Sequence, residues 1–328
     1  MAIDDHALMA RAIVAADDAR RHAPPNPWVG CAIATTSGSI VTGSTRPPGG
    51  PHAEIEALAA TGGRAQGSTL ATTLEPCSHT GRTGPCTSAI IDAGVARVVV
   101  SIEDPDPRVA GTGIAALRAA GIEVNVGVEA DTVTEQLAPY LHHRRTGRPY
   151  VVAKMAATLD GRTAAPDLTS QWITGEAARR DVHRLRSESQ AILVGAGTVR
   201  TDDPQLTVRH VEGNDPRRIV LGTAPPEAKV HPCLEWRGEL GTLLDELGDD
   251  GVLQLMVEGG ASTISQFHAE GLLDRLVVYL APALFGGDDA RPMFAGDGAS
   301  TMAELLRGRF VAVTRLDDDL RIDFEPRR

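Results

Sequence analysis

Four residues between positions 52 and 86 have the types and the spacing of a metal site with its own proton shuttle: His52, Glu54, Cys77 and Cys86. One histidine and two cysteines can supply three ligands to a tetrahedral zinc ion and leave the fourth position open for water, as in catalytic rather than structural zinc sites. On a regular helix, positions i and i+2 point to different sides. His52 and Glu54 can therefore serve one site only near a helix start, where the carboxylate lies beside the metal and not on it.

A His-x-Glu pair followed by Pro-Cys and a second cysteine is typical of zinc deaminases, in which the glutamate is the general acid and base. The usual pattern has two residues between the cysteines, whereas eight residues separate Cys77 from Cys86. This insert ends in Pro85, a favoured first helical residue, so Cys86 is expected in the first turn of an apolar helix. The positive end of that helix favours thiolates and a zinc-bound anion. A structural zinc site or two buried free thiols are the alternatives, and the nearby His-x-Glu pair favours the catalytic site.

Size, charge and cysteine usage narrow the class of protein. The chain has 328 residues, which is longer than a single core usually grows, so two domains are expected. It carries 43 acidic and 32 basic residues, for a net charge of −11, and shows no basic stripe, which argues against a nucleic-acid substrate. Four cysteines are too few for a disulfide scaffold in this length, so Cys31 and Cys233 are expected to be ordinary thiols. No apolar run reaches the length of a membrane span and the first residues do not resemble a signal peptide, so we expect a cytoplasmic protein.

Predicted strands and helices alternate in the first half of the chain. They are a helix over 4–21, a hairpin of strands over 29–34 and 39–42, a helix over 52–60, a strand over 69–73, a helix over 88–93, a strand over 95–101, a helix over 114–119 and a strand over 122–126. This alternation predicts a three-layer α/β/α unit whose metal ligands lie near strand ends and helix starts. A last helix over 131–143 leads into a basic stretch with Gly147 and Pro149, which is typical of a domain linker. We therefore expect domains over 1–146 and 147–328.

The second half is also predicted to be α/β. Strands are expected over 150–156, 191–194, 218–221, 253–257, 276–280, 309–316 and 320–324, and helices over 176–187 and around 265–267. A small-residue loop is expected over 195–198; it lacks the third glycine of the Rossmann fingerprint, so it is either a weak phosphate loop or a simple tight turn. Glu258, Gly259 and Gly260 lie between a strand and a helix start, which is an anion-binding arrangement. Because Glu258 would repel phosphate, we expect it to orient a hydroxyl or an amine.

Several ordered runs of residues resemble the family of bifunctional riboflavin-biosynthesis deaminase-reductases. These runs are 25–31 and the zinc-site stretch through Thr83 in the first half, and 154–161, 171–174, 198–209 and 258–260 in the second. The match covers nearly the whole chain. The resemblance implies a cytidine-deaminase-like first domain that uses Zn²⁺ and a dihydrofolate-reductase-like second domain that binds NADPH without a Rossmann fingerprint. The substrate would be a diaminopyrimidinone ribosylamino 5′-phosphate, a small molecule that is first deaminated on its ring and then reduced at the ribosyl carbon to the ribityl chain.

For the deamination, the zinc ligands and Glu54 take the roles that their chemistry indicates. Zinc on His52, Cys77 and Cys86 would lower the pKa of a bound water from about 15.7 towards about 7. Glu54 would accept its proton, pass it to the ring nitrogen and later to the departing ammonia. The resemblance further implies that Asn26 holds the pyrimidine. It implies that the other residues of the substrate site are His79, Arg82 and Asp104.

For the reduction, the resemblance places Lys154 and Glu258 at the substrate and its reacting carbon. The residues at positions that hold the sugar phosphate are Ser170, Arg186, Leu206 and Arg209. The residues at positions that contact NADPH are Ala156, Trp172, Thr198, Asp202, Gly259 and Gly260. Hydride chemistry belongs to the cofactor, so the task of the protein is alignment and charge balance.

The chain departs from the family pattern at several places. Residues 44–45, Ser-Thr, replace an aromatic-His pair, which removes one possible substrate contact. Residues 167–169 replace a Gly-containing turn before Ser170. The stretch 222–252 looks shorter than in the family, as if a strand and its connection were trimmed, and Gly222 stands where an Asp is common. Most of these changes lie on the reductase side of the chain.

Three alternative functions are weighed against the bifunctional enzyme. A deaminase with a catalytically silent second domain, used for dimerisation or substrate capture, would differ in its affinity for NADPH. A non-enzymatic, zinc-stabilised interaction module would be contradicted by a fold that survives metal removal and by an open water position. A nucleic-acid deaminase is disfavoured by the acidic net charge. The family resemblance also suggests a homodimer or tetramer built on the reductase domains.

Overall fold

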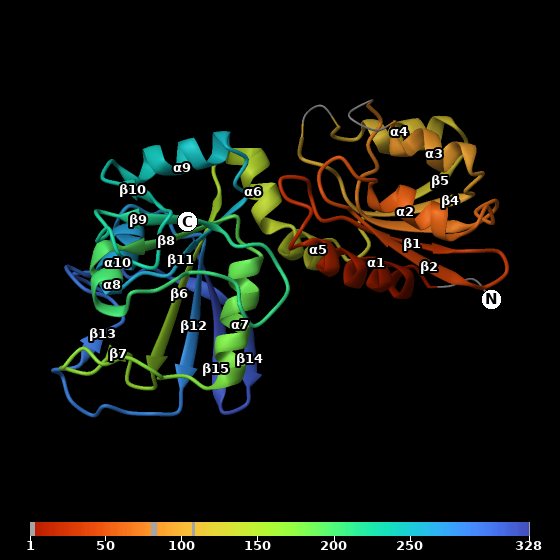
Figure 1. Cartoon of the computed structure of the whole chain (residues 1–328). Helices are drawn as coiled ribbons and strands as arrows, with labels where there is room; N and C mark the ends of the chain where they lie inside the picture. The colour runs from red at the N-terminus through yellow and green to blue at the C-terminus, as the bar shows by residue number, and fades with distance from the viewer. Residues whose placement is uncertain (1–3, 80–83, 107–108, 328) are drawn as a thin grey trace. The chain divides into compact units, whose positions relative to one another are not determined.

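The computed structural model of the chain describes residues 4–79, 84–106 and 109–327. Its elements separate into two compact units, Met1–Gly147 and Arg148–Arg328 (Figure 1). Both units combine a β-sheet with helices, so the predicted α/β class is confirmed. No helix among the described residues is both long enough and apolar enough to cross a lipid bilayer.

The first unit is built on a five-stranded sheet with the order β2-β1-β3-β4-β5. Its strands are β1 (Gly30–Ala34), β2 (Ile40–Ser44), β3 (Thr69–Leu74), β4 (Arg97–Ile102) and β5 (Glu123–Val126). β1 is antiparallel to β2 and β3, whereas β3, β4 and β5 run parallel. The register pairs Leu74 with Ile102. The segments after β3 and β4 therefore leave the same edge of the sheet, which is where open α/β sheets bind their ligands.

Helices cover both faces of this sheet, as expected for three layers. They are α1 (Asp5–Ala19), α2 (Ala53–Ala60), α3 (Cys86–Asp92), α4 (Thr112–Ala119), α5 (Ala130–Gln136) and α6 (Ala138–Thr146). α1 and α5 lie on one face, and α2, α3 and α4 lie together on the other (Figure 1). Under α1, helix and strand residues form one apolar cluster of Leu8, Met9, Ala12, Ala32, Ala71 and Val99. Burial of this cluster stabilises the layer that supports β1 and β3.

Two glycines let helices approach this sheet closely. A Cβ atom on Gly30 of β1 would lie 1.8 Å from the carbonyl oxygen of Ala12 in α1. A Cβ atom on Gly43 of β2 would lie 2.5 Å from the carbonyl oxygen of Ala53 in α2. Only glycine fits where two backbones come this close. Gly43 therefore allows the first turn of α2, which directly follows His52, to lie close against the sheet.

The prediction of one continuous helix over 131–143 is wrong. Two helices occupy this stretch: α5 ends at Gln136 and α6 begins at Ala138, with Leu137 between them at a φ of −93°. Pro139 explains the break, because it has no N–H to donate to the carbonyl group four residues earlier and is tolerated only in the first turn of a helix. The separate helix α6 carries residues that line the pocket of this unit.

The second unit contains an eight-stranded sheet with the order β10-β9-β8-β11-β6-β12-β15-β14. Its strands are β6 (Tyr150–Thr158), β8 (Ala191–Gly195), β9 (Arg217–Leu221), β10 (Leu234–Trp236), β11 (Gln254–Val257), β12 (Arg275–Ala281), β14 (Gly308–Leu316) and β15 (Asp319–Pro326). The strands from β10 to β12 are parallel, and β15 and β14 complete the sheet by antiparallel pairing. A separate two-stranded sheet pairs β7 (Arg162–Ala164) with β13 (Arg291–Pro292). The helices of this unit are α7 (Glu176–Ser187), α8 (Ala196–Asp202), α9 (Leu240–Asp249) and α10 (Ala261–Ala269).

One prediction for this unit is wrong. The stretch 195–198, expected to be a loop, contains the start of helix α8, and Gly195 is the N-cap of that helix. The stretch 222–252, which looks shorter than in the family, contains β10 and α9, neither of which is among the predicted elements. One side of α9 packs into the core with Leu240, Leu243, Leu244 and Leu247. Their spacing of i, i+3, i+4 and i+7 is the signature of an amphipathic helix, so the sequence did carry a signal for α9.

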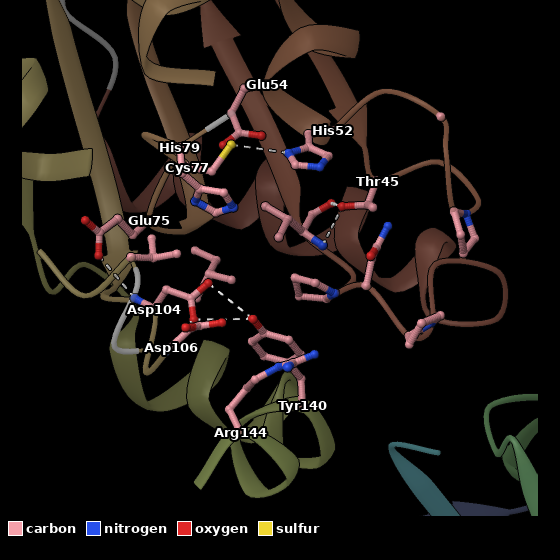
Figure 2. A pocket seen from close by; sticks show the side chains of 18 of the residues that line it. Thr45, His52, Glu54, Glu75, Cys77, His79, Asp104, Asp106, Tyr140 and Arg144 are labelled. Carbon is pink, nitrogen blue, oxygen red and sulfur yellow. Dashed lines mark hydrogen bonds between the residues drawn. The ribbon is translucent and has the colours of Figure 1, made fainter. Parts of the chain in front are cut away.

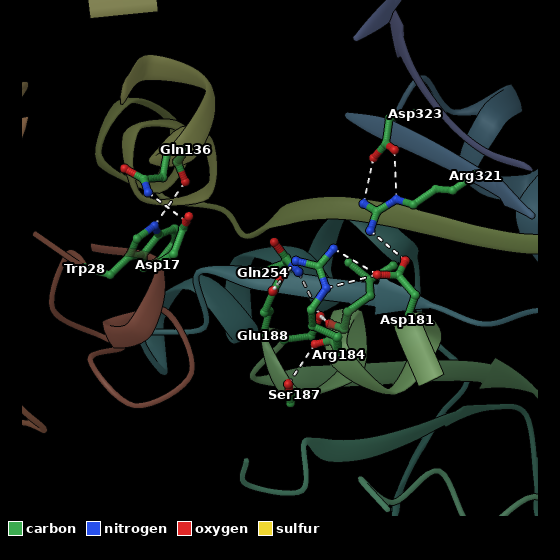
Figure 3. A network of polar contacts seen from close by, with 12 residues as sticks. Asp17, Trp28, Gln136, Asp181, Arg184, Ser187, Glu188, Gln254, Arg321 and Asp323 are labelled. Atoms are coloured by element: carbon green, nitrogen blue, oxygen red, sulfur yellow. Dashed lines mark hydrogen bonds and ion pairs between the residues drawn. The ribbon is translucent and has the colours of Figure 1, made fainter. Parts of the chain in front are cut away.

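Buried ion pairs fasten α7 to the sheet of the second unit (Figure 3). Arg321 of β15 donates two hydrogen bonds to Asp323 and one to Asp181 of α7, all of 2.8 Å. Tyr279 of β12 donates to the same Asp181 carboxylate over 2.7 Å. The charged side chains of this cluster are only 6–15% exposed. Because each buried charge has an opposite partner, the cluster fixes α7 against β12 and β15, and α7 carries Arg186 of the candidate reductase site.

We expect Arg321→Ala to lower the free energy of unfolding of the second unit by about 3–5 kcal/mol, because it leaves the buried carboxylate of Asp323 without its cation and leaves Asp181 with Arg184 alone. Urea unfolding, followed by hydrogen exchange of peptides from α7 and β15, measures this loss. Arg315→Ala removes an exposed arginine from β14 and is the matched control, which should leave the unfolding curve in place. Equal effects of the two variants would contradict a stabilising role of the buried cluster.

Candidate functional sites

His52, Cys77 and Cys86 bring three potential metal ligands together in the first unit, two of which Figure 2 shows. Nδ1 of His52 lies 3.6 Å from Sγ of Cys77 and 3.3 Å from Sγ of Cys86. A tetrahedral zinc ion with ordinary Zn–N and Zn–S bonds holds such atoms about 3.6 Å apart. The donor types and their separations therefore fit a zinc ion.

Each ligand lies where a helix starts or a strand has ended. His52 is the N-cap of α2, Cys77 follows β3, and Cys86 is the first residue of α3, directly after Pro85. The N–H of Cys86 donates to Sγ of Cys77 over 3.4 Å. Hydrogen bonding from the Cys86 side chain, assisted by His52, lowers the pKa of Cys77. The thiolate, which is the form that binds metal, is therefore favoured at Cys77.

Glu54 lies in the first turn of α2 and is 3% exposed. Its carboxyl group is within hydrogen-bonding reach of the Cys86 side chain, which places it beside the three ligands. Burial raises the pKa of Glu54 to about 7, because the interior does not replace the hydration of a carboxylate. A group placed in this way can carry a proton to and from a molecule bound at the metal.

His52, Cys77 and Glu54 line a pocket of about 480 Å³, a volume that suits a small molecule. The predicted substrate residues Asn26, His79 and Asp104 all line this pocket, although they come from three separate segments. Asp104 follows β4 and Cys77 follows β3, so the parallel pairing of these strands brings both to one edge of the sheet. Arg82, the fourth predicted substrate residue, lies outside the described residues.

Sequence reasoning missed a group of pocket residues around Asp104 (Figure 2). Tyr140 of α6 donates its hydroxyl to both carboxylate oxygens of Asp104, over 3.3 and 3.2 Å, and the N–H of Asp106 donates to Oδ1 over 2.9 Å. The guanidinium carbon of Arg144 lies 5.1 Å from the centroid of the Tyr140 ring. Burial raises the pKa of Asp104. The sequence offers no signal for Tyr140 and Arg144, because a polar helix end before a linker is also typical of a solvated surface.

Glu75 anchors the loop that carries Asp104. Its Oε1 accepts hydrogen bonds from the N–H groups of Gly113 and Ile114 over 2.8 and 3.1 Å. Its Oε2 accepts from the N–H groups of Gly111 and Asp104 over 2.9 and 3.3 Å. Two of these donors belong to the first turn of α4, where backbone N–H groups have no partner within the helix. Glu75 therefore connects the end of β3, next to Cys77, to the segment that follows β4.

Thr45 lines the pocket but offers it no free hydroxyl. Its Oγ1 accepts a hydrogen bond from the N–H of Val29 over 3.0 Å and donates to the carbonyl oxygen of Val29 over 3.4 Å. The residue is 3% exposed. The threonine at this position therefore fastens the loop before α2 to the loop before β1.

In the second unit, Lys154, Arg186 and Glu258 form one charged cluster. The register of β11 and β6 pairs Val257 with Ala153, so the next residues along the two strands, Glu258 and Lys154, are neighbours. Lys154 Nζ lies 3.8 Å from Glu258 Oε2, and Arg186 donates to Glu258 Oε1 from Nε and Nη2 over 3.0 and 2.7 Å. Burial alone would raise the pKa of Glu258, but the charges of Arg186 and Lys154 outweigh it and lower that pKa. Glu258 is therefore mostly buried and favoured as an anion.

His183 of α7 holds the loop that carries Arg209. The N–H of Arg209 donates to Nδ1 of His183 over 3.2 Å, and the His210 ring stacks edge-on at 4.6 Å between centroids. Burial, followed by the charges of Arg186 and Arg209, lowers the pKa of His183 to about 4. The imidazole is therefore neutral at pH 7 and can accept this hydrogen bond.

Two glycine-containing helix starts lie side by side at the carboxyl ends of β8 and β11. The N-caps of α8 and α10 are Gly195 and Gly260, and the N–H of Gly260 donates to Oγ1 of Thr198 over 3.2 Å. A Cβ atom on Gly195 would lie 2.5 Å from Oγ1 of Thr263, and one on Gly259 would lie 2.7 Å from its Cβ. Thr263 therefore leaves no room for a side chain at Gly195 or Gly259. A helix start at the carboxyl end of a strand is an anion-binding arrangement, which fits the phosphate groups of NADPH.

The other predicted residues of this unit are more scattered. They lie on β6 (Ala156), in the segment before α7 (Ser170 and Trp172), at the end of α8 (Asp202) and in the loop after it (Leu206). In the part of the chain that the structure describes, no hydrogen bond or ion pair joins these side chains to Glu258 or Gly260. Trp172 is 69% exposed and stacks under the guanidinium of Arg179 at 4.7 Å. The structure therefore brings together the charged cluster of Lys154, Arg186 and Glu258. It also brings together the glycine pair, Gly195 and Gly260, at two helix starts. The side chains of the scattered residues make no polar contact with either group in the described part of the chain.

We expect Cys86→Ser to lower zinc affinity by at least about 100-fold, because a serine hydroxyl replaces a thiolate ligand. Mutation of a residue that only hydrogen-bonds to a metal ligand can already lower metal affinity by up to about 100-fold. Metal analysis after dialysis against a zinc buffer measures zinc per chain. Cys233→Ser, the same chemical change on a thiol in the second unit, should retain one zinc. Full zinc occupancy in Cys86→Ser would show that the three residues do not form the metal site.

We expect the second unit to lose stability as the pH falls from about 6.5 towards 5. The unfolded chain binds a proton at His183 in this range, whereas the folded chain, with its pKa of about 4, does not. His183→Asn keeps an acceptor for the N–H of Arg209 and should lose less stability over the same interval. Urea midpoints at pH 7 and pH 5 measure the difference, with His268→Asn as the control. Parallel losses in all three proteins would rule out His183 as the cause.

Comparisons with known proteins agree with both sites. Residues 2–102 match the cytidine and deoxycytidylate deaminase zinc-binding region, and residues 149–322 match the RibD C-terminal domain. The chain is 42% identical over 311 residues to the riboflavin biosynthesis protein RibD of Mycobacterium tuberculosis, and the match covers 90% of each chain. These matches agree with the two predicted cofactors, Zn²⁺ for the deaminase domain and NADPH for the reductase domain.

Solved structures confirm the predicted pair of folds. The structure of Acinetobacter baumannii RibD matches with a TM-score of 0.90 and 38% identity, covering 99% of both chains. A diaminohydroxyphosphoribosylaminopyrimidine deaminase/5-amino-6-(5-phosphoribosylamino)uracil reductase of Thermotoga maritima matches with a TM-score of 0.87 and 31% identity, covering 98% of this chain and 99% of the other. The chain therefore belongs to the RibD family, the bifunctional deaminase-reductases of riboflavin biosynthesis.

Proposed function

We propose that the first unit deaminates 2,5-diamino-6-(5-phosphoribosylamino)pyrimidin-4(3H)-one and that the second unit reduces the ribosyl group of the product to ribityl with NADPH. The observation that carries the first step is the set of three zinc-type ligands with Glu54 beside them at a pocket of small-molecule size. The second step is supported by the buried cluster of Lys154 and Glu258 near the glycine pair. Family membership supports both steps in one chain.

In the deamination, His52, Cys77 and Cys86 would hold zinc, which when bound supplies a Lewis acid that makes water a better nucleophile. Glu54 holds the transferred proton, because its carboxyl group is buried next to the ligands and burial raises its pKa to about 7. It delivers that proton first to the ring nitrogen and then to the leaving ammonia.

The pocket residues orient the substrate for this step. Asn26 presents an amide, which can both donate to and accept from a pyrimidine edge. His79 and Asp104 lie along the same pocket, and Tyr140 fixes the Asp104 carboxyl group by hydrogen bonding to both of its oxygens. Arg82 is assigned to the substrate by family resemblance alone.

In the reduction, NADPH supplies the hydride and the protein aligns the ribosyl carbon with it. Lys154 and Glu258 face this carbon and balance the charge that develops there. Arg186 donates hydrogen bonds from Nε and Nη2 to Glu258 and from Nη1 to the carbonyl oxygen of Thr207. We therefore assign Arg186 to positioning Glu258 as well as to the sugar-phosphate region. Arg209 has an exposed guanidinium and is better placed to meet the phosphate group.

The remaining positions of the reductase site are assigned by their place in the fold. Ser170 and Leu206 are proposed to border the sugar phosphate. Contacts to NADPH are proposed for Ala156, Trp172, Thr198, Asp202, Gly259 and Gly260. The helix starts at Gly195 and Gly260 would receive cofactor phosphates, because the first backbone N–H groups of a helix have no partner within it and favour anions.

A deaminase with a silent second domain is the competing function. The intact cluster of Lys154, Arg186 and Glu258 argues against it, because an unused buried ion cluster offers little stability over apolar packing. Two finer assignments depend on the family resemblance: assembly into a homodimer or tetramer through the reductase domains, and a location in the cytoplasm, where NADPH and a substrate made from GTP are at hand.

A coupled assay of the zinc-loaded chain with the diaminopyrimidinone phosphate, in which ammonia release and NADPH oxidation are followed separately, tests the assignment. We expect both signals from the wild type. Glu54→Gln should lower ammonia release by about 100- to 10,000-fold, since it removes the general acid and base, and should oxidise NADPH when supplied with the deaminated compound. Glu258→Gln should show the reverse pattern.

Two outcomes of this assay would change the assignment. Ammonia release without NADPH oxidation by the wild type would leave a deaminase with a silent second domain. Neither signal from an intact, zinc-containing chain would rule out the substrate. Zinc content and thermal unfolding of each variant show whether a lost signal reflects lost chemistry or a lost fold.

A further inference from the structure

The pocket of the first unit has two chemically different ends (Figure 2). At one end lie the zinc-type ligands and Glu54, where the ring would react. At the other end lie Asp104, Tyr140 and Arg144, the last two on helix α6. A substrate whose ring is held at the first end extends its ribosyl phosphate towards the second. The chemistry of the second end therefore decides which sugar substituent is accepted.

Charge is unevenly distributed over this pocket. Its lining includes four carboxyl groups, on Glu54, Glu75, Asp104 and Asp106, whereas Arg144 is the one Lys or Arg residue among the described lining residues. Four backbone N–H groups already satisfy Glu75. A phosphate group that enters a pocket rich in carboxyl groups needs a cation near it, because its charge is otherwise repelled.

Arg144 has the geometry of a guanidinium prepared for an anion. It is half-buried, its Nε is buried without a hydrogen-bond partner among the described residues, and it forms no ion pair with a described carboxylate. Its guanidinium carbon lies over the Tyr140 ring, 5.1 Å from the centroid. Stacking on an aromatic ring fixes a guanidinium and leaves its edge donors free, and phosphate accepts such donors in pairs.

We propose that Arg144 binds the 5′-phosphate of the pyrimidine substrate during deamination, with Tyr140 holding its guanidinium in place and Asp104 bound to the ribosyl hydroxyl groups beside it. This inference rests on the proposed function and adds a specificity determinant to it. Tyr140 links the two groups physically, because its hydroxyl binds Asp104 and its ring face contacts Arg144. The deaminase pocket then selects the phosphorylated compound over the free ribosylamino compound.

The test compares ammonia release from the phosphorylated substrate and from the same compound after removal of its phosphate group. The variants are Arg144→Gln, which keeps hydrogen-bonding capacity but loses the charge, and Arg144→Lys. We expect Arg144→Gln to lower the ratio of kcat/KM for the phosphorylated over the dephosphorylated compound by about 10- to 100-fold, the usual cost of one or two charge-assisted hydrogen bonds. The loss should appear in KM, and Arg144→Lys should restore part of the ratio. Arg145→Gln, which changes the exposed neighbour on the same helix, should keep the wild-type ratio.

The outcomes separate this inference from the proposed function. If the wild type releases no ammonia from either compound, the proposed function fails and the inference fails with it. If the wild type is active and Arg144→Gln slows both compounds equally, Arg144 supports only the packing of Tyr140 and the inference is wrong. An unchanged ratio in Arg144→Gln would overturn it as well. Zinc content shows that the first unit of each variant is folded, and oxidation of NADPH in the presence of the deaminated compound shows that the second unit is folded.

Discussion

The first site depends on one geometric constraint: three ligand atoms must lie within 4.8 Å of one another, although Cys77 and Cys86 follow His52 by 25 and 34 residues. In this unit the three residues meet where elements begin or end. α2 and α3 begin at the site and β3 ends at it. Gly43 lets α2 lie against the sheet, and Glu75 ties the end of β3 to the segment after β4. In this unit the starts of two helices and the end of one strand thus meet at the candidate metal site.

Two buried glutamates show how the same side chain is given opposite behaviour. For Glu54, burial outweighs the attraction of His52 and raises its pKa to about 7, so it can gain and lose a proton. Glu258 is mostly buried too, but Arg186 and Lys154 lower its pKa, which favours its charged form. A proton carrier suits a hydrolytic deamination, whereas a fixed anion suits the alignment of a substrate for hydride transfer. The surrounding charges, rather than the residue type, therefore divide the two chemistries between the two units.

Supporting interactions link stability to function in both units. Arg321 and its carboxylates hold α7, which presents Arg186 to Glu258 and His183 to the Arg209 loop. In the first unit, Tyr140 holds Asp104 in a comparable way. In each case a side chain that touches no reacting atom sets the position of one that is assigned to the substrate. These supports lie far from their targets in the sequence, since Arg321 follows Asp181 by 140 residues.

The sequence by itself determined the α/β class, the three zinc-type ligands and the place of Glu54, because these depend on local period, on short spacings and on a helix start. It failed where contacts between distant segments decide the outcome. The predicted helix over 131–143 is two helices, and the second brings Tyr140 and Arg144 to the pocket, which no local pattern reveals. The helix α9 carried a readable apolar period and was overlooked, whereas the pairing of Glu258 with Arg186, 72 residues apart, became visible only in the folded chain. Periodicity reports which face of an element is buried, but only the tertiary structure decides which buried faces meet, because that choice depends on strand order and register.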